Sequence, residues 1–473
     1  MTGKYIRVTQ LAWLRQWEHS RYSLQIVSAN SRPLSLQVTD LQKTSPFLSL
    51  VVFNQHAFLS TRTTTPHSPA MDDYSMYKPT NLLYTQEKLS KYRLGGYHPV
   101  CLGDTLHDGQ YTIRHKLGWG GFSTVWLARD SRNDRWVSIK IMTAESGTDS
   151  QELLNLRDLA THAKGDLASK YIVQLLDAFQ HEGPNGTHQC LVFELLGPCV
   201  DQVLSEHHDD GEPFEQNVIL RMCEQLLEAV AFMHEAGFCH GDISGRNIAF
   251  KCNEAAQLSE EEFFEVIGNP EIDELVRNDG QPVPKGMPSQ LVKAAAWDTW
   301  IDEDDEDLRI IDFGETFKQG SEPVKLAQPG PLRAPETIFE DKFDYRLDLW
   351  RAGIVIYSLV LEAHPFRYLG GDEALAKEMI GFVEKLPTEW EPNFQKLLLN
   401  ANQKADNFKD SAPDAKSKLE VIFEEKVAEE SLRPLLSVIQ GLMRFKPEDR
   451  ISASQALKLV RAIRRQSNEI NDG

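Results

Sequence analysis

Hydrophobic and polar residues alternate in several short segments between positions 111 and 194, which predicts a lobe made mostly of β-strands. These segments are 111–114, 124–128, 136–141, 172–179 and 189–194, while residues 150–163 have the longer repeat of a helix. After Gly197 the helical repeat dominates, and it predicts helices over 215–236, 346–362, 373–384, 417–441 and 453–466. The pattern therefore predicts an α+β fold, with a small β-rich lobe at 111–196 and a larger helical lobe at 197–466. A functional site is expected between two such lobes.

Two segments do not follow this pattern. Residues 1–90 are rich in Ser and Thr, carry several arginines and have few acids, so we expect a disordered leader, with a transit peptide as the alternative. Residues 91–110 form a short N-terminal extension, and 467–473 a tail. Residues of about 252–307 interrupt the helical lobe and end in the acidic run 302–307. We predict a partly disordered acidic insert there, either a solvated loop or a tether for basic partners.

Charge and cysteine content narrow the class of protein. The formal net charge of −20 argues against direct binding to nucleic acid or to an anionic membrane, and it is compatible with a basic substrate. The six cysteines include no CxxC pair, which indicates reduced thiols in an intracellular protein. No apolar run approaches the roughly 20 residues that span a bilayer. We expect a monomer.

The string that carries most chemistry is His240-Gly241-Asp242-Ile243-Ser244-Gly245-Arg246-Asn247, followed downstream by Asp312-Phe313-Gly314. Asp242 can accept the proton of an incoming hydroxyl, and Asn247 and Asp312 can hold the metal ions that bridge the phosphates of ATP. The two strings together predict a phosphoryl transferase that uses ATP and Mg²⁺.

A glycine-rich turn in the small lobe fits the same chemistry. Its backbone N–H groups can meet phosphate oxygens, and its residues are Leu117, Gly118, Trp119, Gly120, Gly121, Phe122, Ser123, Thr124 and Val125. Lys140, on the third predicted strand, can pair with the α- and β-phosphates and be held by Glu152 on the helix that follows. The apolar strand that ends the lobe predicts a hinge, where the backbone of Glu194 and Leu196 would bond adenine.

Three strings in the helical lobe predict a platform for a peptide. They are Ala334-Pro335-Glu336, Asp348-Leu349-Trp350-Arg351-Ala352-Gly353 and Pro447-Glu448-Asp449-Arg450. We expect Glu336 and Arg450 to form a buried pair that anchors the segment beginning at Asp312.

In this order the strings resemble a eukaryotic protein kinase domain over about residues 111–466. Tyr97-His98-Pro99-Val100, together with residues 116–127, resembles the kinases of serine/arginine-rich splicing proteins, and their fungal members in particular. The resemblance implies a bilobal kinase fold and transfer of the γ-phosphate of Mg-ATP to serine or threonine of proteins. It implies Arg/Ser-rich splicing factors as substrates, in cytoplasm and nucleus. It also implies Asp242 as proton acceptor, Lys140 as the ATP lysine, and Asn247 and Asp312 as metal ligands.

The chain departs from the serine/threonine pattern at two positions that bear on the acceptor. Ser244 stands where such kinases have a lysine that contacts the transferred phosphate, and Pro329 where they have a threonine. We predict that Arg246 supplies the missing cation. An arginine and a proline at these positions are features of tyrosine kinases, so tyrosine or dual specificity stays open.

A third departure bears on regulation. Gly241 replaces the arginine that normally meets a phosphate on the activation segment. We therefore predict activity that does not need phosphorylation at Thr316 or Ser321.

Three alternatives remain at this point. His240-Gly241-Asp242 and Ile310–Glu315 would also suit a small-molecule kinase of the aminoglycoside or choline type, although the peptide platform argues against it. Ser244 and Pro329 leave room for a pseudokinase scaffold. A divergent kinase with its own substrate is the third, and the region after Glu362 would decide it. There Asp372, Glu373 and Glu378 form either an acidic docking face for arginine-rich peptides or an ordinary solvated helix face.

Overall fold

The computed structural model describes residues 74–163, 170–210, 214–253, 255–297, 307–326, 328–340, 342–368, 370–401 and 416–471. The chain divides into residues 1–56 and 57–473, and every described residue belongs to the second unit. The predictions made for residues 1–73, and for the acidic run at 302–306, lie outside the described residues.

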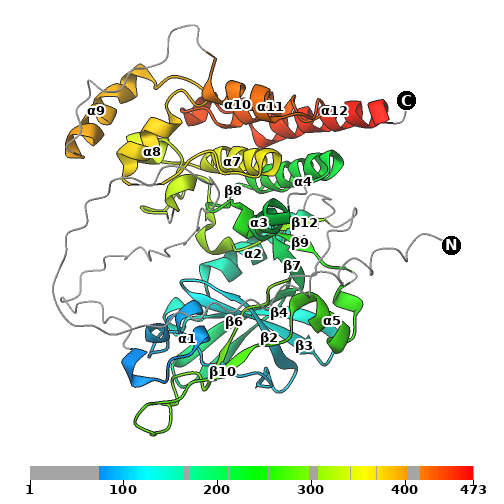
Figure 1. The fold of residues 1–473 in the computed structure, drawn as a ribbon, viewed down its shortest axis with the longest axis vertical. Helices are drawn as coiled ribbons and strands as arrows, with labels where there is room; N and C mark the ends of the chain where they lie inside the picture. Colours follow the sequence, from blue (N-terminus) through cyan, green and yellow to red (C-terminus); the bar gives the residue numbers. More distant parts are fainter. Residues whose placement is uncertain are drawn as a thin grey trace, which may run out of the picture. The chain divides into compact units, whose positions relative to one another are not determined.

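The small lobe is an antiparallel sheet with one long helix, as the alternating pattern predicts (Figure 1). The strands lie in the order β1-β2-β3-β4-β6-β5. Their bounds are β1 Thr105–Leu106, β2 Tyr111–Trp119, β3 Ser123–Asp130, β4 Arg135–Met142, β5 Leu175–Gly183 and β6 Gly186–Glu194. Alternate residues of these strands are fully buried against one another, among them Ile113, Ile139 and Val192.

Helix α2 (Gln151–His162) begins where the sequence predicts. Ser150 precedes it in an extended conformation, and its hydroxyl accepts a hydrogen bond from the backbone N–H of Leu153 at 3.3 Å. This cap satisfies one of the unpaired N–H groups of the first turn. Because the cap fixes the start of the helix, it also fixes the direction in which Glu152 points.

The large lobe is helical, with short strand pairs that carry the catalytic loop. Its helices are α3 Val200–Asp210, α4 Gln216–Glu235, α6 Glu336–Phe339, α7 Leu347–Leu361, α8 Asp372–Met379, α9 Glu391–Asn400, α10 Lys418–Lys426, α11 Leu435–Leu442 and α12 Ala453–Asn471. Its strands are β7 Leu196–Cys199, β8 Phe238–Cys239, β9 Ile248–Lys251, β12 Leu308–Ile310 and β13 Phe317–Lys318.

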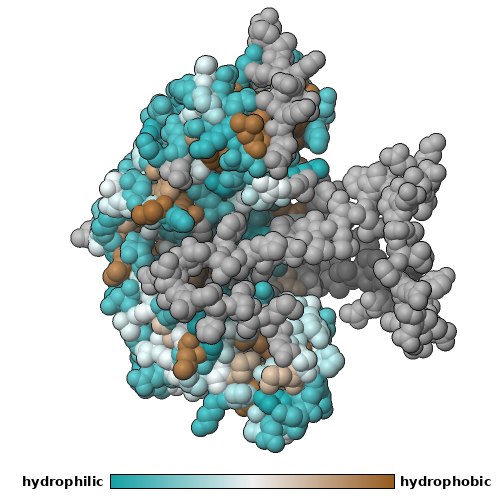
Figure 2. Space-filling model, turned by 90° about the vertical axis from the view of Figure 1, so that its left-hand side faces the viewer, coloured by the Kyte–Doolittle hydropathy of each residue, from teal (hydrophilic) through white to brown (hydrophobic). Residues whose placement is uncertain are grey.

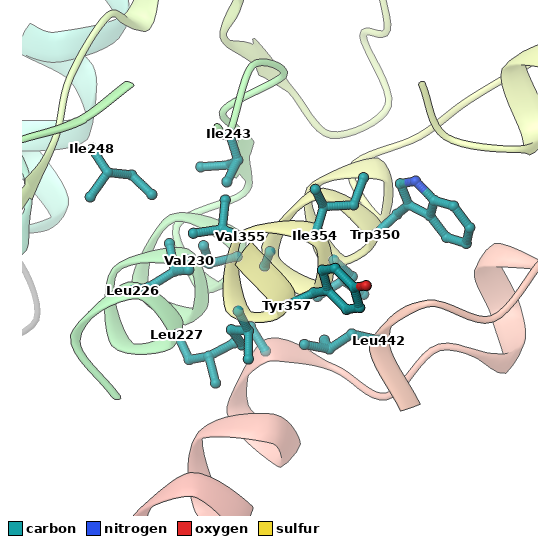
Figure 3. Packing of buried hydrophobic residues seen from close by; sticks show 14 of the residues in the cluster. Leu226, Leu227, Val230, Ile243, Ile248, Trp350, Ile354, Val355, Tyr357 and Leu442 are labelled. Atoms are coloured by element: carbon teal, nitrogen blue, oxygen red, sulfur yellow. The ribbon is translucent and has the colours of Figure 1, made fainter. Parts of the chain in front are cut away.

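Helices α4 and α7 form the centre of this lobe. Every residue of α7 from Leu347 to Leu359 is buried, and Leu226, Leu227 and Val230 of α4 pack against it (Figure 3). Ile243 of the catalytic loop points into the same cluster beside Val355, which ties the loop to α7.

Two helix predictions in this lobe are wrong in their bounds. The helix predicted over 417–441 is two helices, because the backbone becomes extended at Val427 after α10, and α11 begins only after Pro434. The helix predicted over 373–384 ends at Met379, since the chain turns at Gly381 with a φ of +74°.

Residues 255–297, where the sequence predicts partial disorder, are folded against the small lobe. Helix α5 (Glu260–Ile267) is fixed by a capping box between Ser259 and Glu262, and Phe263 packs between Trp136 and Trp297. Strands β10 (Ile272–Glu274) and β11 (Gln290–Val292) pair with each other.

Residues 74–90, assigned by sequence to the leader, are folded as well. They include helix α1 (Asn81–Thr85), and Leu82 and Leu83 pack against Leu275 and Leu291 of the insert. The insert and this extension therefore support each other on the small lobe.

The surface is polar where it can be seen. On the face shown in Figure 2 the coloured residues are mainly hydrophilic, and hydrophobic ones are scattered in small separate groups. Within the described ranges, no helix combines the length and the apolar character needed to cross a membrane.

Candidate active site

Lys140 joins three parts of the chain. From β4 its Nζ lies 2.6 Å from Glu152 Oε2 on α2 and 2.9 Å from Asp312 Oδ1 after β12. Burial disfavours the ammonium form, but the carboxylates of Asp312 and Glu152 outweigh it and raise the pKa of Lys140. The ammonium in turn lowers the pKa of Asp312, while burial raises that of Glu152. The three predicted site residues thus form one charge cluster.

The backbone around Asp312 is held from two sides. Asp312 has a left-handed backbone with a φ of +66°, and its side chain is half exposed. Phe313 is buried with its ring edge-to-face against His240, at 4.9 Å between centroids. Asn155 of α2 donates to the carbonyl of Thr316 at 2.7 Å. These contacts couple the position of α2, and hence of Glu152, to that of Asp312.

Asp242 and Asn247 face each other across the catalytic loop. The amide nitrogen of Asn247 donates to both the carbonyl oxygen and Oδ2 of Asp242, each at 2.8 Å. Buried Asp348 of α7 holds the loop from beneath, since its carboxylate accepts the N–H of His240 at 2.7 Å and of Gly241 at 3.0 Å. Burial alone would raise the pKa of Asp348, but hydrogen bonding, from His234 first, lowers it overall.

The arrangement fits a bound Mg²⁺. Asn247 directly precedes β9 and Asp312 follows β12 at the same end of that strand pair, where the N–H of Ile311 donates to the Asn247 carbonyl at 2.9 Å. A carboxylate oxygen of Asp312 and the amide oxygen of Asn247 are the hard oxygen ligands that Mg²⁺ prefers.

The glycine-rich turn between β2 and β3 leaves space where a phosphate chain would lie. A Cβ at Gly118 or Gly121 would meet nothing within 4 Å, and one at Gly120 only Ser123 Oγ at 4.0 Å. None of the three has a positive φ, so neither packing nor backbone conformation requires glycine. Close approach of a ligand to the backbone is the reason that remains.

The extension before residue 100 reaches this turn. The Tyr97 hydroxyl donates to the Gly120 carbonyl, and Lys91 Nζ to the Gly121 carbonyl at 3.3 Å. The other predicted members of the turn lie in or beside the hairpin, and Phe122 at its tip is 63% exposed.

The predicted hinge lies between the lobes. Glu194 ends β6, and its carboxylate accepts from Arg309 Nε at 3.0 Å and from the backbone N–H of Gln174 at 2.9 Å. Leu196 begins β7. Contact of these two backbones with adenine stays a prediction.

Arg246, predicted to supply the cation for the transferred phosphate, lies beside helix α3, and its role stays a prediction. Its side chain is 60% exposed, and its Nε lies 3.7 Å from Asp201 Oδ2 on α3. Helix α3 comes so close that a Cβ at Gly245 would lie 2.0 Å from Asp201 Oδ1. The carboxylate of α3 therefore attracts the Arg246 guanidinium, and a different arginine contacts Asp242.

That arginine is Arg351 of α7, which the sequence analysis missed as a site residue. Its Nη1 lies 2.6 Å from Asp242 Oδ1, and its side chain is 0% exposed. A signal existed, because Arg351 and Asp348 are charged residues within a mostly apolar helical run. The missing lysine position, Ser244, is buried and lines a small hollow with Asp201, Ser358 and His364.

The activation segment packs so closely against Gly241 of the catalytic loop that an arginine side chain does not fit there. Gly241 has a φ of +81°, and a Cβ there would lie 2.5 Å from the Glu315 carbonyl oxygen. Thr316 is buried and donates to the His240 carbonyl at 3.1 Å, whereas Ser321 is exposed.

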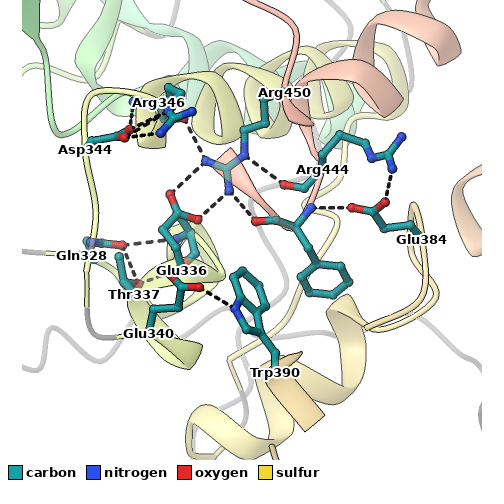
Figure 4. Close-up of polar contacts among 12 residues, drawn as sticks. Gln328, Glu336, Thr337, Glu340, Asp344, Arg346, Glu384, Trp390, Arg444 and Arg450 are labelled. Carbon is teal, nitrogen blue, oxygen red and sulfur yellow. Dashed lines mark hydrogen bonds and ion pairs between the residues drawn. The ribbon is translucent and has the colours of Figure 1, made fainter. Parts of the chain in front are cut away.

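The expected pair between Glu336 and Arg450 is confirmed (Figure 4). Two guanidinium nitrogens of Arg450 bind the two carboxylate oxygens of Glu336, at 2.9 and 2.5 Å. Arg450 also donates to the backbone carbonyls of Arg346, Arg444 and Phe445. Both side chains are almost fully buried, so helix α6 is fixed to the end of the lobe.

Comparison with known proteins agrees with this geometry. The family model for the protein kinase domain matches residues 111–260 and 300–460. Protein kinase dsk1 of Schizosaccharomyces pombe is 37% identical over 167 residues, which are 34% of this chain and 30% of that protein. Serine/threonine-protein kinase SRPK of Physarum polycephalum is 26% identical over 424 residues, 79% of this chain and 90% of that protein.

A solved structure shows the same fold. The crystal structure of the PF14_0431 kinase domain has a TM-score of 0.51 at 19% identity, and the match covers 76% of this chain and 97% of that chain. The predicted bilobal fold is thereby confirmed. With the family model matching well over half of its residues, this chain belongs to the protein kinase domain family, and its homologues are SRPK-type kinases that include a fungal member.

Proposed function

We propose that this protein is a serine/threonine protein kinase that transfers the γ-phosphate of Mg-ATP to hydroxyl groups of proteins. The observation that carries the proposal is the contact of Lys140 with both Glu152 and Asp312, with Asp242 and Asn247 joined beside them. In this arrangement the cation for phosphates, the metal ligands and the proton acceptor are in place together.

Each residue has a role that its position supports. Lys140 binds the α- and β-phosphates, held by Glu152. Asp312 and Asn247 would hold Mg²⁺, which would supply the positive charge that compensates the phosphates during transfer. Asp242 orients the substrate hydroxyl and accepts its proton as the oxygen bonds to the γ-phosphorus and ADP leaves. Most of the rate enhancement then comes from positioning and charge compensation.

For the substrate class we propose arginine/serine-rich proteins such as splicing factors, phosphorylated in cytoplasm and nucleus. The relative named SRPK and the net charge of −20 support this proposal. The acids of α8 support it less, because Arg333 Nη1 lies 2.5 Å from Asp372, and Glu378 accepts the backbone N–H of Arg367. An incoming arginine would compete with these internal partners.

The experiment is phosphorylation of an arrayed peptide library with Mg-ATP, read by the type of residue labelled. The array includes matched Arg-Ser, Lys-Ser and Arg-Tyr repeats, and Asp242→Asn is the inactive control. We expect label on serine in the Arg-Ser repeats and much less in the Lys-Ser repeats, since lysine cannot make bidentate pairs with carboxylates. Label confined to tyrosine would overturn the serine assignment. No label, with ATP still bound, would favour a scaffold or a small-molecule kinase.

A further inference from the structure

Arg351 is an unusual residue to find beneath a catalytic loop. It is completely enclosed, it lies on the largely buried helix α7, and its hydrogen-bond partner among the described residues is Asp242. Its Nε and Nη2 have no hydrogen-bond partner among the described residues. A buried guanidinium that satisfies one N–H group is costly to keep, because charge is removed from water with little compensation. Because burying Arg351 in this way is costly, we expect its contact with Asp242 to have a function.

We propose that Arg351 is the positioning residue for Asp242. The inference deepens the kinase function proposed above and rests on it. The arginine of the loop itself, Arg246, lies 3.7 Å from Asp201 on α3.

The geometry explains how Arg351 acts. Asp348 and Arg351 are three residues apart on α7 and so lie on one face of the helix. Asp348 holds the backbone of the loop through the N–H groups of His240 and Gly241, and Arg351 holds the side chain of Asp242. Backbone and carboxylate are thus fixed from the same rigid helix.

Fixing one carboxylate oxygen leaves the other for chemistry. Arg351 binds Oδ1 of Asp242, and Oδ2 lies beside the amide nitrogen of Asn247. When the substrate oxygen bonds to the γ-phosphorus and the bond to the β,γ-bridging oxygen breaks, the hydroxyl proton passes to Oδ2. Without Arg351 the carboxylate keeps, among the described residues, only the hydrogen bond from Asn247, and its charge lacks an adjacent cation.

The test compares turnover of the full chain in five forms, which are wild type, Arg351→Met, Arg351→Lys, Asp242→Asn and the double variant Asp242→Asn/Arg351→Met. Arg351→Met should lower kcat by roughly 100-fold, within the range for loss of a general base, while KM for ATP changes by less than about threefold. Arg351→Lys, which keeps the charge, should recover part of the loss. Nucleotide affinity, measured with a fluorescent ATP analogue, should be unchanged.

The double variant separates positioning from support of the fold. If Arg351 acts through Asp242, adding Arg351→Met to Asp242→Asn should change the remaining kcat by less than about threefold. A purely structural role predicts instead that the two losses multiply, that Arg351→Lys does not rescue, and that KM for ATP rises. That pattern would overturn the proposal.

Arg464→Met serves as the matched control. Arg464 lies on α12, pairs at 2.8 Å with Glu224 and has no described contact with the catalytic loop, so kcat should not change. If Arg351→Met does not fold, Arg351→Lys and its double variant with Asp242→Asn decide, and losses of kcat that multiply in the double variant would overturn the proposal. If the wild type is active and Arg351→Met is equally active, the role of Arg351 is refuted and the kinase function stands. A wild type that labels no protein would overturn the kinase function and this inference with it.

Discussion

Removing Arg450 should destabilise the large lobe by an amount that its contacts define. Arg450→Met leaves the Glu336 carboxylate buried without its cation, at 2% side-chain exposure, and leaves three backbone carbonyls without their donor. Breaking a buried ion pair from one side costs about 3–5 kcal/mol of unfolding free energy. For a unit of roughly 400 residues, with about 2.1 cal/mol/K of unfolding entropy per residue, this corresponds to a fall in Tm of about 5 °C.

A double-mutant cycle tests whether the unpaired carboxylate causes the loss. Glu336→Leu combined with Arg450→Met removes both charges, so we expect it to recover at least about 2 kcal/mol relative to Arg450→Met alone. Urea unfolding followed by tryptophan fluorescence measures these differences, and thermal unfolding gives the Tm. The reasoning fails if Arg450→Met lies within about 1 kcal/mol of wild type, or if the double variant is no more stable than the single one.

An exposed pair provides the control. Lys416 and Glu424 lie 2.6 Å apart, but their side chains are 60% and 56% exposed. Lys416→Met should therefore change the unfolding free energy by less than about 1 kcal/mol. A loss as large as that of Arg450→Met would show that burial is not what sets the magnitude.

Three further predictions concern regulation, catalysis and pH. The Thr316→Ala, Ser321→Ala double variant should keep its turnover within about threefold, because the buried threonine only donates to the His240 carbonyl; loss of most turnover on a peptide substrate would contradict this. Glu152→Gln should lower kcat/KM for ATP by roughly tenfold to hundredfold, since it removes the carboxylate that holds the ATP lysine at 2.6 Å; steady-state kinetics with an unchanged value would contradict it. Burial and two neighbouring histidine rings lower the pKa of His98 to about 3, so the unfolded chain binds a proton first as pH falls below about 6.5. That difference should remove about 2 kcal/mol of stability between pH 7 and pH 5, as measured by urea unfolding, and His98→Gln should lose about 2 kcal/mol less over the same interval.

The arginine next to the catalytic aspartate illustrates where sequence reasoning stops. The sequence offers Arg246, four residues after Asp242, as the cation for the transferred phosphate, but does not show that an arginine contacts Asp242 itself. The structure turns it toward Asp201, since α3 packs against the loop at Gly245. Arg351 is more than a hundred positions from Asp242 in the chain, and only the packing of α7 under the loop brings them to 2.6 Å.

Local patterns determined much of this protein. Alternation and helical repeats gave the two lobes, and the strings around Lys140, Asp242 and Asp312 indicated the chemistry, because strand, turn and helix preferences depend on neighbours within a few residues. Tertiary structure alone decided that the insert folds onto the extension, that Asp312 joins the pair of Lys140 and Glu152, and that Arg351 contacts Asp242. Those outcomes depend on which distant faces become buried together and which charges must then find partners, and no short-range spacing encodes that.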